Sequence, residues 1–158
     1  MKSLLKTTLA AASIVALSAG VASAQLETDR AKIEAVLRTY ETALNASDSD
    51  TVMTLYTPDG VFMPQHSPSQ VGVVAVRGAY ERVFKAITLD IEFEVVEILQ
   101  VAPDWAFVRT NSAGFVTVHA TGEKAPEANQ ELFVFRKRDD GDWKIARYIF
   151  TTTNPPRR

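Results

Sequence analysis

The sequence contains no cysteine, which excludes thiolate nucleophiles, disulfide bridges, cysteine-ligated zinc and iron–sulfur clusters. It has no basic excess either, since 17 Lys and Arg residues stand against 19 Asp and Glu residues, so nucleic acid is not an expected partner. Only two histidines are present, and motifs for nucleotides, dinucleotides or an acyl-enzyme serine are missing. We therefore expect no metal and no cofactor.

What is present is a hydrophobic fraction of 46% in 158 residues, enough for the core of one domain. The chain begins with Lys2 and Lys6, the apolar run Leu9–Leu17 and the sequence Ala22-Ser-Ala24. This order is typical of a cleaved signal peptide, whereas a membrane anchor would need roughly 20 apolar residues. We expect a signal peptide over residues 1–24, one domain over 25–154, a short tail over 155–158, and a periplasmic or secreted product with no membrane association.

Hydrophobic periodicity predicts three helices before any long strand. Apolar residues recur at three- and four-residue steps from Asp29 to Leu44 and again from Val73 to Ala86, with a short helix over Thr51–Tyr56 between them. A turn at Pro58-Asp-Gly60 ends the short helix, and two prolines with a glycine place 64–72 in a loop.

Alternating patterns predict four strands in the second half of the chain, with a hairpin signal at Asp140-Gly141. The first strand slips its phase at Val95-Val96, where we expect a bulge, and the second is interrupted at Gly114. Helices followed by strands describe an α+β domain in which a curved antiparallel sheet encloses a pocket. The expected strands cover Ile91–Ile98, Trp105–His119, Glu131–Arg138 and Trp143–Thr153, with 123–129 as a connection.

Four segments carry a resemblance to a known family: Tyr40-Glu-Thr-Ala-Leu-Asn45, Leu55-Tyr-Thr-Pro-Asp-Gly-Val-Phe-Met-Pro64, Val76-Arg-Gly-Ala-Tyr-Glu-Arg-Val-Phe84 and Gly141-Asp-Trp-Lys-Ile-Ala-Arg147. They resemble the nuclear transport factor 2-like superfamily and, within it, the SnoaL-like and DUF4440-type proteins. The resemblance implies a cone-shaped α+β barrel with three N-terminal helices, a homodimer packed through the sheets, and a mostly apolar cavity. It does not choose among isomerases, cyclases, dehydratases, hydrolases and members without assigned chemistry.

Ketosteroid isomerases within this superfamily use a carboxylate base and two hydrogen-bond donors. By resemblance, Tyr40 matches the donor tyrosine of the first helix and Glu131 lies near the second, acidic donor. Met63 occupies the position of the catalytic aspartate, and a thioether cannot accept the proton, so steroid isomerisation by that mechanism is not expected. Tyr40 can equally be a core residue whose hydroxyl reaches a backbone partner.

Glu131 shares a strand face with Phe133, so both project into the cavity if that face is the inner one. A carboxylate in an apolar cone must be paired or protonated. Arg109, on the face with Phe107 and Asn111, and Arg147, on the face with Trp143, Ile145 and Ile149, are the expected partners. Such pairing is either purely structural or anchors a polar or anionic ligand group.

His66 and Gln65 lie in the loop expected at the cavity mouth, where imidazole can exchange a proton near neutral pH. A solvated loop histidine is the alternative, and the other histidine, His119, is expected to be exposed. The candidate catalytic residues are Tyr40, His66 and Glu131. The candidate ligand-binding residues are Phe62, Met63, Gln65, Phe107, Arg109, Phe133 and Arg147.

Three functions remain open from the sequence. The first is binding of a small, largely apolar organic molecule in the cone, and it is the one we favour. The second is a lyase, isomerase or hydrolase that needs no cofactor. The third is a non-catalytic module whose exposed sheet recruits another protein, in which case the pocket is filled by the protein's own side chains.

Overall fold

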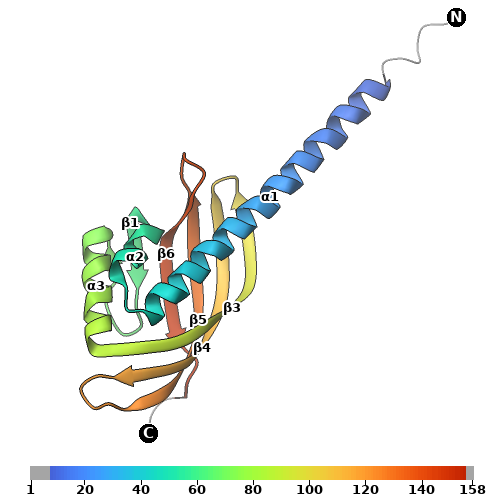
Figure 1. The fold of residues 1–158 in the computed structure, drawn as a ribbon. Coiled ribbons are helices and arrows are strands. Elements are labelled where there is room, and N and C mark those ends of the chain that lie inside the picture. The colour runs from blue at the N-terminus through green and yellow to red at the C-terminus, as the bar shows by residue number, and fades with distance from the viewer. Residues whose placement is uncertain (1–7, 156–158) are drawn as a thin grey trace, which may run out of the picture.

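The computed structural model describes residues 8–155, with side chains from Ser23 onward, and arranges three helices and six strands as one α+β unit (Figure 1). The three predicted helices and the four predicted strands are all present. The helices are α1 (Thr8–Asn45), α2 (Ser49–Leu55) and α3 (Val73–Ala86). The strands are β1 (Tyr56–Met63), β2 (Gln70–Val71), β3 (Ile87–Ala102), β4 (Trp105–Val118), β5 (Lys124–Lys137) and β6 (Trp143–Thr152).

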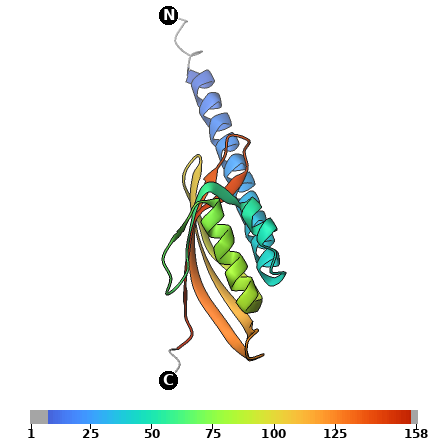
Figure 2. The same cartoon turned by 90° about the vertical axis from the view of Figure 1, so that its left-hand side faces the viewer.

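The six strands form one curved sheet in the order β2-β1-β6-β5-β4-β3. Strands β3 to β6 make the predicted antiparallel meander, while β1 pairs with β6 in parallel and turns the sheet into a mixed one. The helices cover one face of this sheet and leave the other face bare (Figure 2). The cone-shaped α+β fold expected from the sequence is therefore confirmed, although the sheet does not close on itself.

Helix α1 buries the stripe that its periodicity predicts. Ile33, Leu37, Tyr40 and Leu44 are each 5% exposed or less and pack against the concave face of the sheet. The predicted signal peptide starts outside the described residues and stays a prediction, while from Thr8 the backbone is helical and continuous with the buried part of α1. Among the described residues, no helix is long and apolar enough to cross a membrane.

Two segments expected outside the regular elements belong to strands. The turn at residues 58–60 lies within β1, whose pairing with β6 is irregular between Tyr56 and Val61. The connection expected over 123–129 is mostly strand, because β5 begins at Lys124 and pairs with β4 from its first residue. Pairing with a long neighbouring strand overrides the weak local alternation of this segment.

Bulges set which residues face the concave side. The phase slip at Val95-Val96 is confirmed, since the register of β3 against β4 shifts between Val95 and Glu97. A second shift lies in β6, where Arg147 pairs with Val134 but Ile145 pairs with Phe135, so Ala146 is the extra residue. The interruption expected at Gly114 is wrong, because β4 runs through it without a register shift.

Candidate functional site

Aromatic rings from two helices and several strands pack together on the concave face of the sheet. Phe62 of β1 stacks on Tyr80 of α3 at 4.8 Å and on Tyr148 of β6 at 5.5 Å between ring centroids. Phe133 of β5 stacks on Tyr148 at 4.3 Å, and Phe150 continues the stack outward from Tyr148 at 5.9 Å. The deep part of the cone is thus filled by the protein's own rings rather than open, and Phe62 and Phe133 lie in this filling at 3% and 0% exposure.

Tyrosine hydroxyls form a hydrogen-bonded cluster inside the aromatic layer. The hydroxyl of Tyr80 lies 2.5 Å from that of Tyr40 and 2.9 Å from that of Tyr56. Burial, together with the neighbouring phenols, raises the pKa of Tyr40 well above its ordinary value of 10.0, so Tyr40 stays a neutral donor and acceptor. The sequence suggested a backbone partner for the Tyr40 hydroxyl, but in the structure its partner is the hydroxyl of Tyr80.

Glu131 is a buried carboxyl on the concave face, 5% exposed. Its Oε2 accepts from the hydroxyl of Thr110 at 2.6 Å, and its Oε1 accepts from the hydroxyl of Ser112. Burial raises its pKa, and the two hydroxyl bonds oppose this effect only in part. The carboxyl is therefore held by neutral donors, and its charge also raises the pKa of Tyr148 after the larger effect of burial.

A pocket of about 1190 Å³ opens where the aromatic stack ends. Asn129 of β5 lies in its wall and is 8% exposed, and its Nδ2 donates to Ser112 Oγ at 3.4 Å. A chain of polar groups therefore leads from Glu131 through Ser112 to the pocket. The lining residues are Gln65, His66, Glu123, Ala125, Pro126, Glu127, Asn129, Phe150, Thr152, Asn154 and Pro155.

The loop after β1 supplies another part of the wall, as expected for a cavity mouth. Gln65 accepts from the backbone N–H of Thr152 through Oε1, which ties the loop to β6. Its Nε2 lies 2.7 Å from Nε2 of His66, an exposed residue with a φ of 58°. Gln65 thus orients the imidazole at the rim, while Met63, at the end of β1, is half-buried and is not part of the lining.

The expected convergence of Tyr40, His66 and Glu131 is only partial. His66 lines the pocket directly, whereas Glu131 stands one hydrogen-bonded step behind its wall. Tyr40 is fully buried, with its ring packed against those of Phe133 and Tyr148, and it does not line this pocket. Their catalytic roles stay predictions.

The prediction that Arg109 and Phe107 point into the cavity is wrong. Both belong to the same face of β4, as expected, but this is the convex face, and Phe107 is 41% exposed. The Arg109 guanidinium binds Glu97 of β3 at 2.6 Å instead of Glu131. Small side chains, such as Ala106 and Thr110, face inward on β4, because rings from α1, β3 and β5 already occupy the concave side.

The same correction holds for Arg147, and the bulge at Ala146 is the reason. Strict alternation places Arg147 on the face of Trp143 and Ile145, but the extra residue reverses the phase. Tyr148 therefore points inward, and Arg147 lies on the outside at 39% side-chain exposure. It donates to the carbonyl oxygen of Asp59 at 3.2 Å and lies 4.0 Å from that residue's carboxylate.

Several residues of the site had no clear signal in the sequence. Thr110, Ser112 and Asn129 are common polar residues within strands, and only their buried register positions mark them. Alternation from Glu131 backwards along β5 places Asn129 on the same face, which is the one signal that was available. The hydroxyl cluster of Tyr40, Tyr56 and Tyr80 joins three separate elements, α1, β1 and α3, so the sequence gives no local signal for it.

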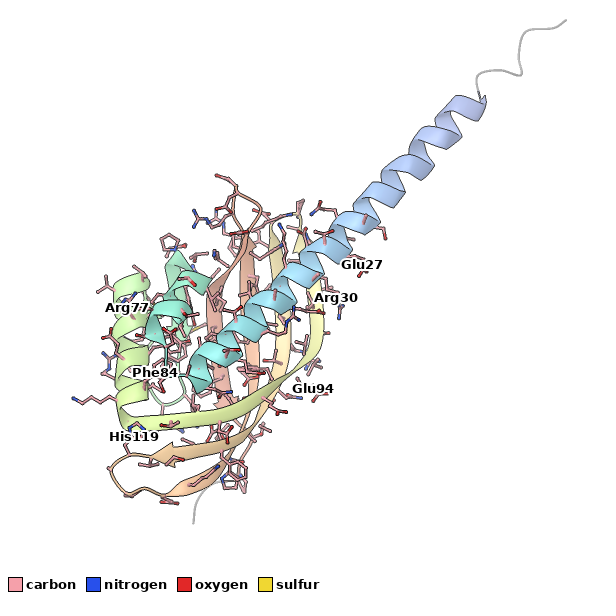
Figure 3. All side chains as sticks on the ribbon, viewed as in Figure 1. Glu27, Arg30, Arg77, Phe84, Glu94 and His119 are labelled. Atoms are coloured by element: carbon pink, nitrogen blue, oxygen red, sulfur yellow. The ribbon has the colours of Figure 1, made fainter. Side chains whose placement is uncertain are left out.

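Metal-ligating side chains do not gather in the part of the chain that the structure describes, where no three His, Asp or Glu residues lie together. His119 is exposed, as expected, and lies at the end of α3 (Figure 3). Its Nδ1 is 2.9 Å from the carbonyl oxygen of Lys85, and its Nε2 is 2.8 Å from Thr88 Oγ1. These bonds tie the residue after β4 to the end of α3 and to the start of β3.

Fold and site together define a small cone-shaped domain of the nuclear transport factor 2-like type. The model of the SnoaL-like domain family matches residues 36–148, so the chain belongs to this family. A comparison with curated proteins finds no match.

Solved structures agree with this assignment. A ketosteroid isomerase-like protein from Erwinia carotovora atroseptica is 41% identical, with a TM-score of 0.77 over 79% of this chain and 96% of that one. A hexachlorocyclohexane dehydrochlorinase from Novosphingobium barchaimii has a TM-score of 0.75 at 10% identity, covering 84% and 91% of the two chains. A nuclear transport factor 2-like protein from Salmonella enterica has a TM-score of 0.72 at 13% identity, covering 82% and 94%. The last two show the fold alone.

Proposed function

We propose that the protein binds a small, largely apolar organic molecule in the pocket at the mouth of the cone. The observation that carries this proposal is the polar chain from the buried Glu131 through Ser112 to Asn129, which ends in the pocket wall beside Phe150. A small-molecule site usually combines apolar or aromatic surface with convergent polar groups, and Phe150 supplies the aromatic ring of this lining. The ligand's apolar part would lie on Phe150 and its polar part on Asn129.

The chain is also proposed to be exported, with residues 1–24 removed. The test therefore starts from the periplasmic or secreted fraction of the native host. The protein is captured under non-denaturing conditions, and the small molecules released from it are identified by mass spectrometry. A molecule that is released stoichiometrically from the wild type and binds it again supports the proposal, whereas an empty protein that binds none of the host's small molecules contradicts it.

An enzyme without a cofactor is the second candidate, and one observation favours it. His66 lines the pocket, and Glu131, whose pKa burial raises, lies one hydrogen-bonded step behind its wall, so two groups for proton transfer lie at or near the same pocket. The ketosteroid isomerase-like protein at 41% identity is consistent with such a role. This candidate predicts that the bound molecule is converted rather than only held.

Substituting Glu131→Gln separates the two candidates. For a binding protein we expect the molecule to be recovered unchanged from the wild type, and the variant to alter only its dissociation constant. For an enzyme, turnover falls by about 100-fold or more while binding is retained, and His66→Ala acts in the same direction. Calorimetry and product analysis measure both quantities. Glu97→Gln, an exposed carboxyl paired with Arg109 on the convex face, is the matched control and should change neither.

A homodimer packed through the sheets is proposed as the assembly. The convex face, which no helix covers, exposes apolar side chains that a monomer would leave in water: Leu99 is 56% exposed, Phe107 41%, Leu132 38% and Ile149 42%. Leu132 and Ile149 also line a groove of about 300 Å³ on this face. A second copy of the chain would cover these side chains.

Substituting Leu132→Asp is expected to convert the dimer into a monomer, because it places a charge in the apolar centre of the convex face. Light scattering during size-exclusion chromatography measures the mass. Val74→Asp, at an 83% exposed valine of α3, is the control and should leave the dimer intact. A monomeric wild type at the same concentration would contradict the assembly.

A further inference from the structure

The free edge of the sheet along β3 is capped by α1 over only part of its length. β3 is the last strand of the sheet and pairs with β4 alone, so its outer side presents backbone N–H and C=O groups without a strand partner. Asn45 of α1 bonds both groups of Ile91, donating to the carbonyl oxygen at 2.7 Å and accepting from the N–H at 3.0 Å. Glu41 accepts from the N–H of Phe93 at 2.7 Å. Among the described residues, the bonds from α1 side chains to the backbone of β3 end there.

The outward-facing backbone groups continue beyond this capped part. Successive residues of a strand turn their N–H and C=O groups to alternate edges, so Ile91 and Phe93 mark Val95 as the next residue that faces outward. The bulge adds one residue after Val95, which makes Ile98 and Gln100 the following outward-facing residues. We call the stretch from Val95 to Gln100 the open edge.

Two hollows, of about 320 and 220 Å³, lie between α1 and β3 beside the open edge. Apolar side chains of both elements contribute to each lining. These are Leu37, Phe93 and Val95 in the larger hollow and Leu26, Ile33 and Ile98 in the smaller one. An extended chain bonded to the open edge would turn every second side chain toward these hollows, because side chains along a strand alternate between its two faces. Apolar residues at those positions fit the linings.

The opposite, convex side of β3 is acidic. Its exposed carboxylates are those of Asp90, Glu92, Glu94 and Glu97. The first and the last are paired with Lys124 and Arg109, whereas Glu92 and Glu94 have no ion pair among the described residues. Glu94 lies at the outer edge of the sheet in Figure 3. A strand added here meets unpaired carboxylates on its convex side, and opposite charges across neighbouring strands stabilise their pairing, which favours lysine or arginine.

The same charges disfavour a second copy of this chain as the occupant of the open edge. Two β3 strands paired with each other would bring the acidic rows of both copies side by side. Like charges opposite one another destabilise a strand pair. A basic partner segment has no such penalty.

We propose that the open edge binds an extended segment of a partner protein as an added strand, with apolar side chains turned toward α1 and lysine or arginine side chains turned toward Glu94. Backbone hydrogen bonds to Val95, Ile98 and Gln100 hold the segment, while the hollows and the carboxylates select its sequence. The hollows share no lining residue with the mouth pocket. The site therefore goes beyond the proposed small-molecule function.

Capped heptapeptides test the proposal on the purified wild-type protein. The first peptide alternates lysine and valine, and the second has glutamate in place of each lysine. Binding is followed by the amide chemical shifts of the labelled protein. We expect the lysine peptide to shift the amides of Val95, Ile98 and Gln100 and to bind about ten-fold tighter than the glutamate peptide.

N-methylated forms of the lysine peptide test the main-chain bonds. One form is methylated on its valine amides and the other on its lysine amides. Only one alternate set of amides faces the open edge, so we expect one form to lose about ten-fold or more in affinity and the other to stay within about three-fold of the parent peptide. Equal affinities of the two forms would show that the peptide does not bind as a strand.

Charge reversal locates the preference at the edge. Glu94→Lys should abolish or reverse the preference for the lysine peptide, because it replaces the attracting carboxylate by a like charge. Glu81→Lys, the same change at an exposed glutamate of α3, is the matched control and should keep the ten-fold preference.

The remaining outcomes separate this site from the mouth pocket. Equal binding of the lysine and glutamate peptides to the wild type, shifts confined to the mouth pocket, or no binding of any peptide overturns the proposal. Shifts of the open-edge amides on raising the protein concentration alone would assign the edge to a second copy and also overturn it. None of these results removes the proposed small-molecule function, which its own ligand experiment tests.

Discussion

Replacing Asp29 by alanine is expected to lower the free energy of unfolding by about 3–5 kcal/mol, because it breaks a buried ion pair and leaves the other charge behind. Asp29 of α1 is 1% exposed. Its carboxylate accepts from Lys137 Nζ at 2.8 Å and from Trp143 Nε1 at 3.1 Å, which ties the helix to β5 and β6. In the alanine variant, the half-buried ammonium of Lys137 and the buried indole N–H of Trp143 both lose the carboxylate that accepts from them. Urea unfolding followed by tryptophan fluorescence measures the loss.

The matched control removes a carboxylate from an exposed ion pair. Asp50 of α2 binds Arg77 of α3, which is labelled in Figure 3, and the Asp50 side chain is 87% exposed. Asp50→Ala should change stability by about 1 kcal/mol or less, since exposed pairs contribute little. Equal, small losses for both variants would show that burial does not strengthen the Asp29 pair.

The same carboxylate gives stability a defined pH dependence. Burial alone would raise the pKa of Asp29, but the hydrogen bonds from Lys137 and Trp143 outweigh it and hold the pKa below the ordinary value of 3.8. A carboxyl with a depressed folded pKa stabilises fully above its unfolded value, and the effect is lost as pH falls through the folded pKa. We expect the difference in stability between wild type and Asp29→Asn to shrink as the pH falls below 3.8 and through the lowered folded pKa. A difference that does not shrink as the pH is lowered below 3.8 would contradict this assignment.

Replacing Gly114 by alanine is the second substitution with a large expected effect. A Cβ at this position would lie 2.1 Å from the carbonyl oxygen of Asp90 and 2.8 Å from Cα of Ile91. Both atoms are backbone of β3, so no side-chain rotation relieves the clash, and the two strands must separate locally. We expect a loss of about 3 kcal/mol, the upper part of the range for overpacking, measured by the same urea titration.

Gly78→Ala is the control that matches this change in chemistry. Gly78 lies within α3, and its added Cβ would meet only the flexible guanidinium end of Arg82, at 3.3 Å. Alanine is favoured over glycine in a helix interior by about 1 kcal/mol, so this variant should be as stable as the wild type or more so. A tolerated Gly114→Ala would mean that β3 and β4 do not approach as closely as described.

Much of the fold could be predicted because its signals are local. The buried stripe from Ile33 to Leu44 follows from helical spacing alone, and the bulge at Val95-Val96 is visible as two adjacent valines in an alternating strand. The parallel pairing of β1 with β6 joins segments far apart in the chain and has no local signal. The same holds for β5, whose first residues are held in the sheet by β4.

The site shows where local reasoning fails. Alternation correctly grouped Arg109 with Phe107 but could not say which face of β4 is concave, because both faces carry apolar residues. Arg147 was misplaced by the single extra residue at Ala146, which the sequence does not mark. Glu131 was placed correctly, since its face is shared with two buried phenylalanines.

By itself, the sequence determined the order of helices and strands, the family, the absence of thiol chemistry and a carboxyl on the phenylalanine face of β5. Only the tertiary structure decided that the deep cone is filled by rings, that both arginines lie outside, and that Asn129 meets the mouth pocket. The physical reason is that periodicity assigns side chains to the faces of one element. Which face becomes concave depends on bulges and on rings from distant elements competing for the same space.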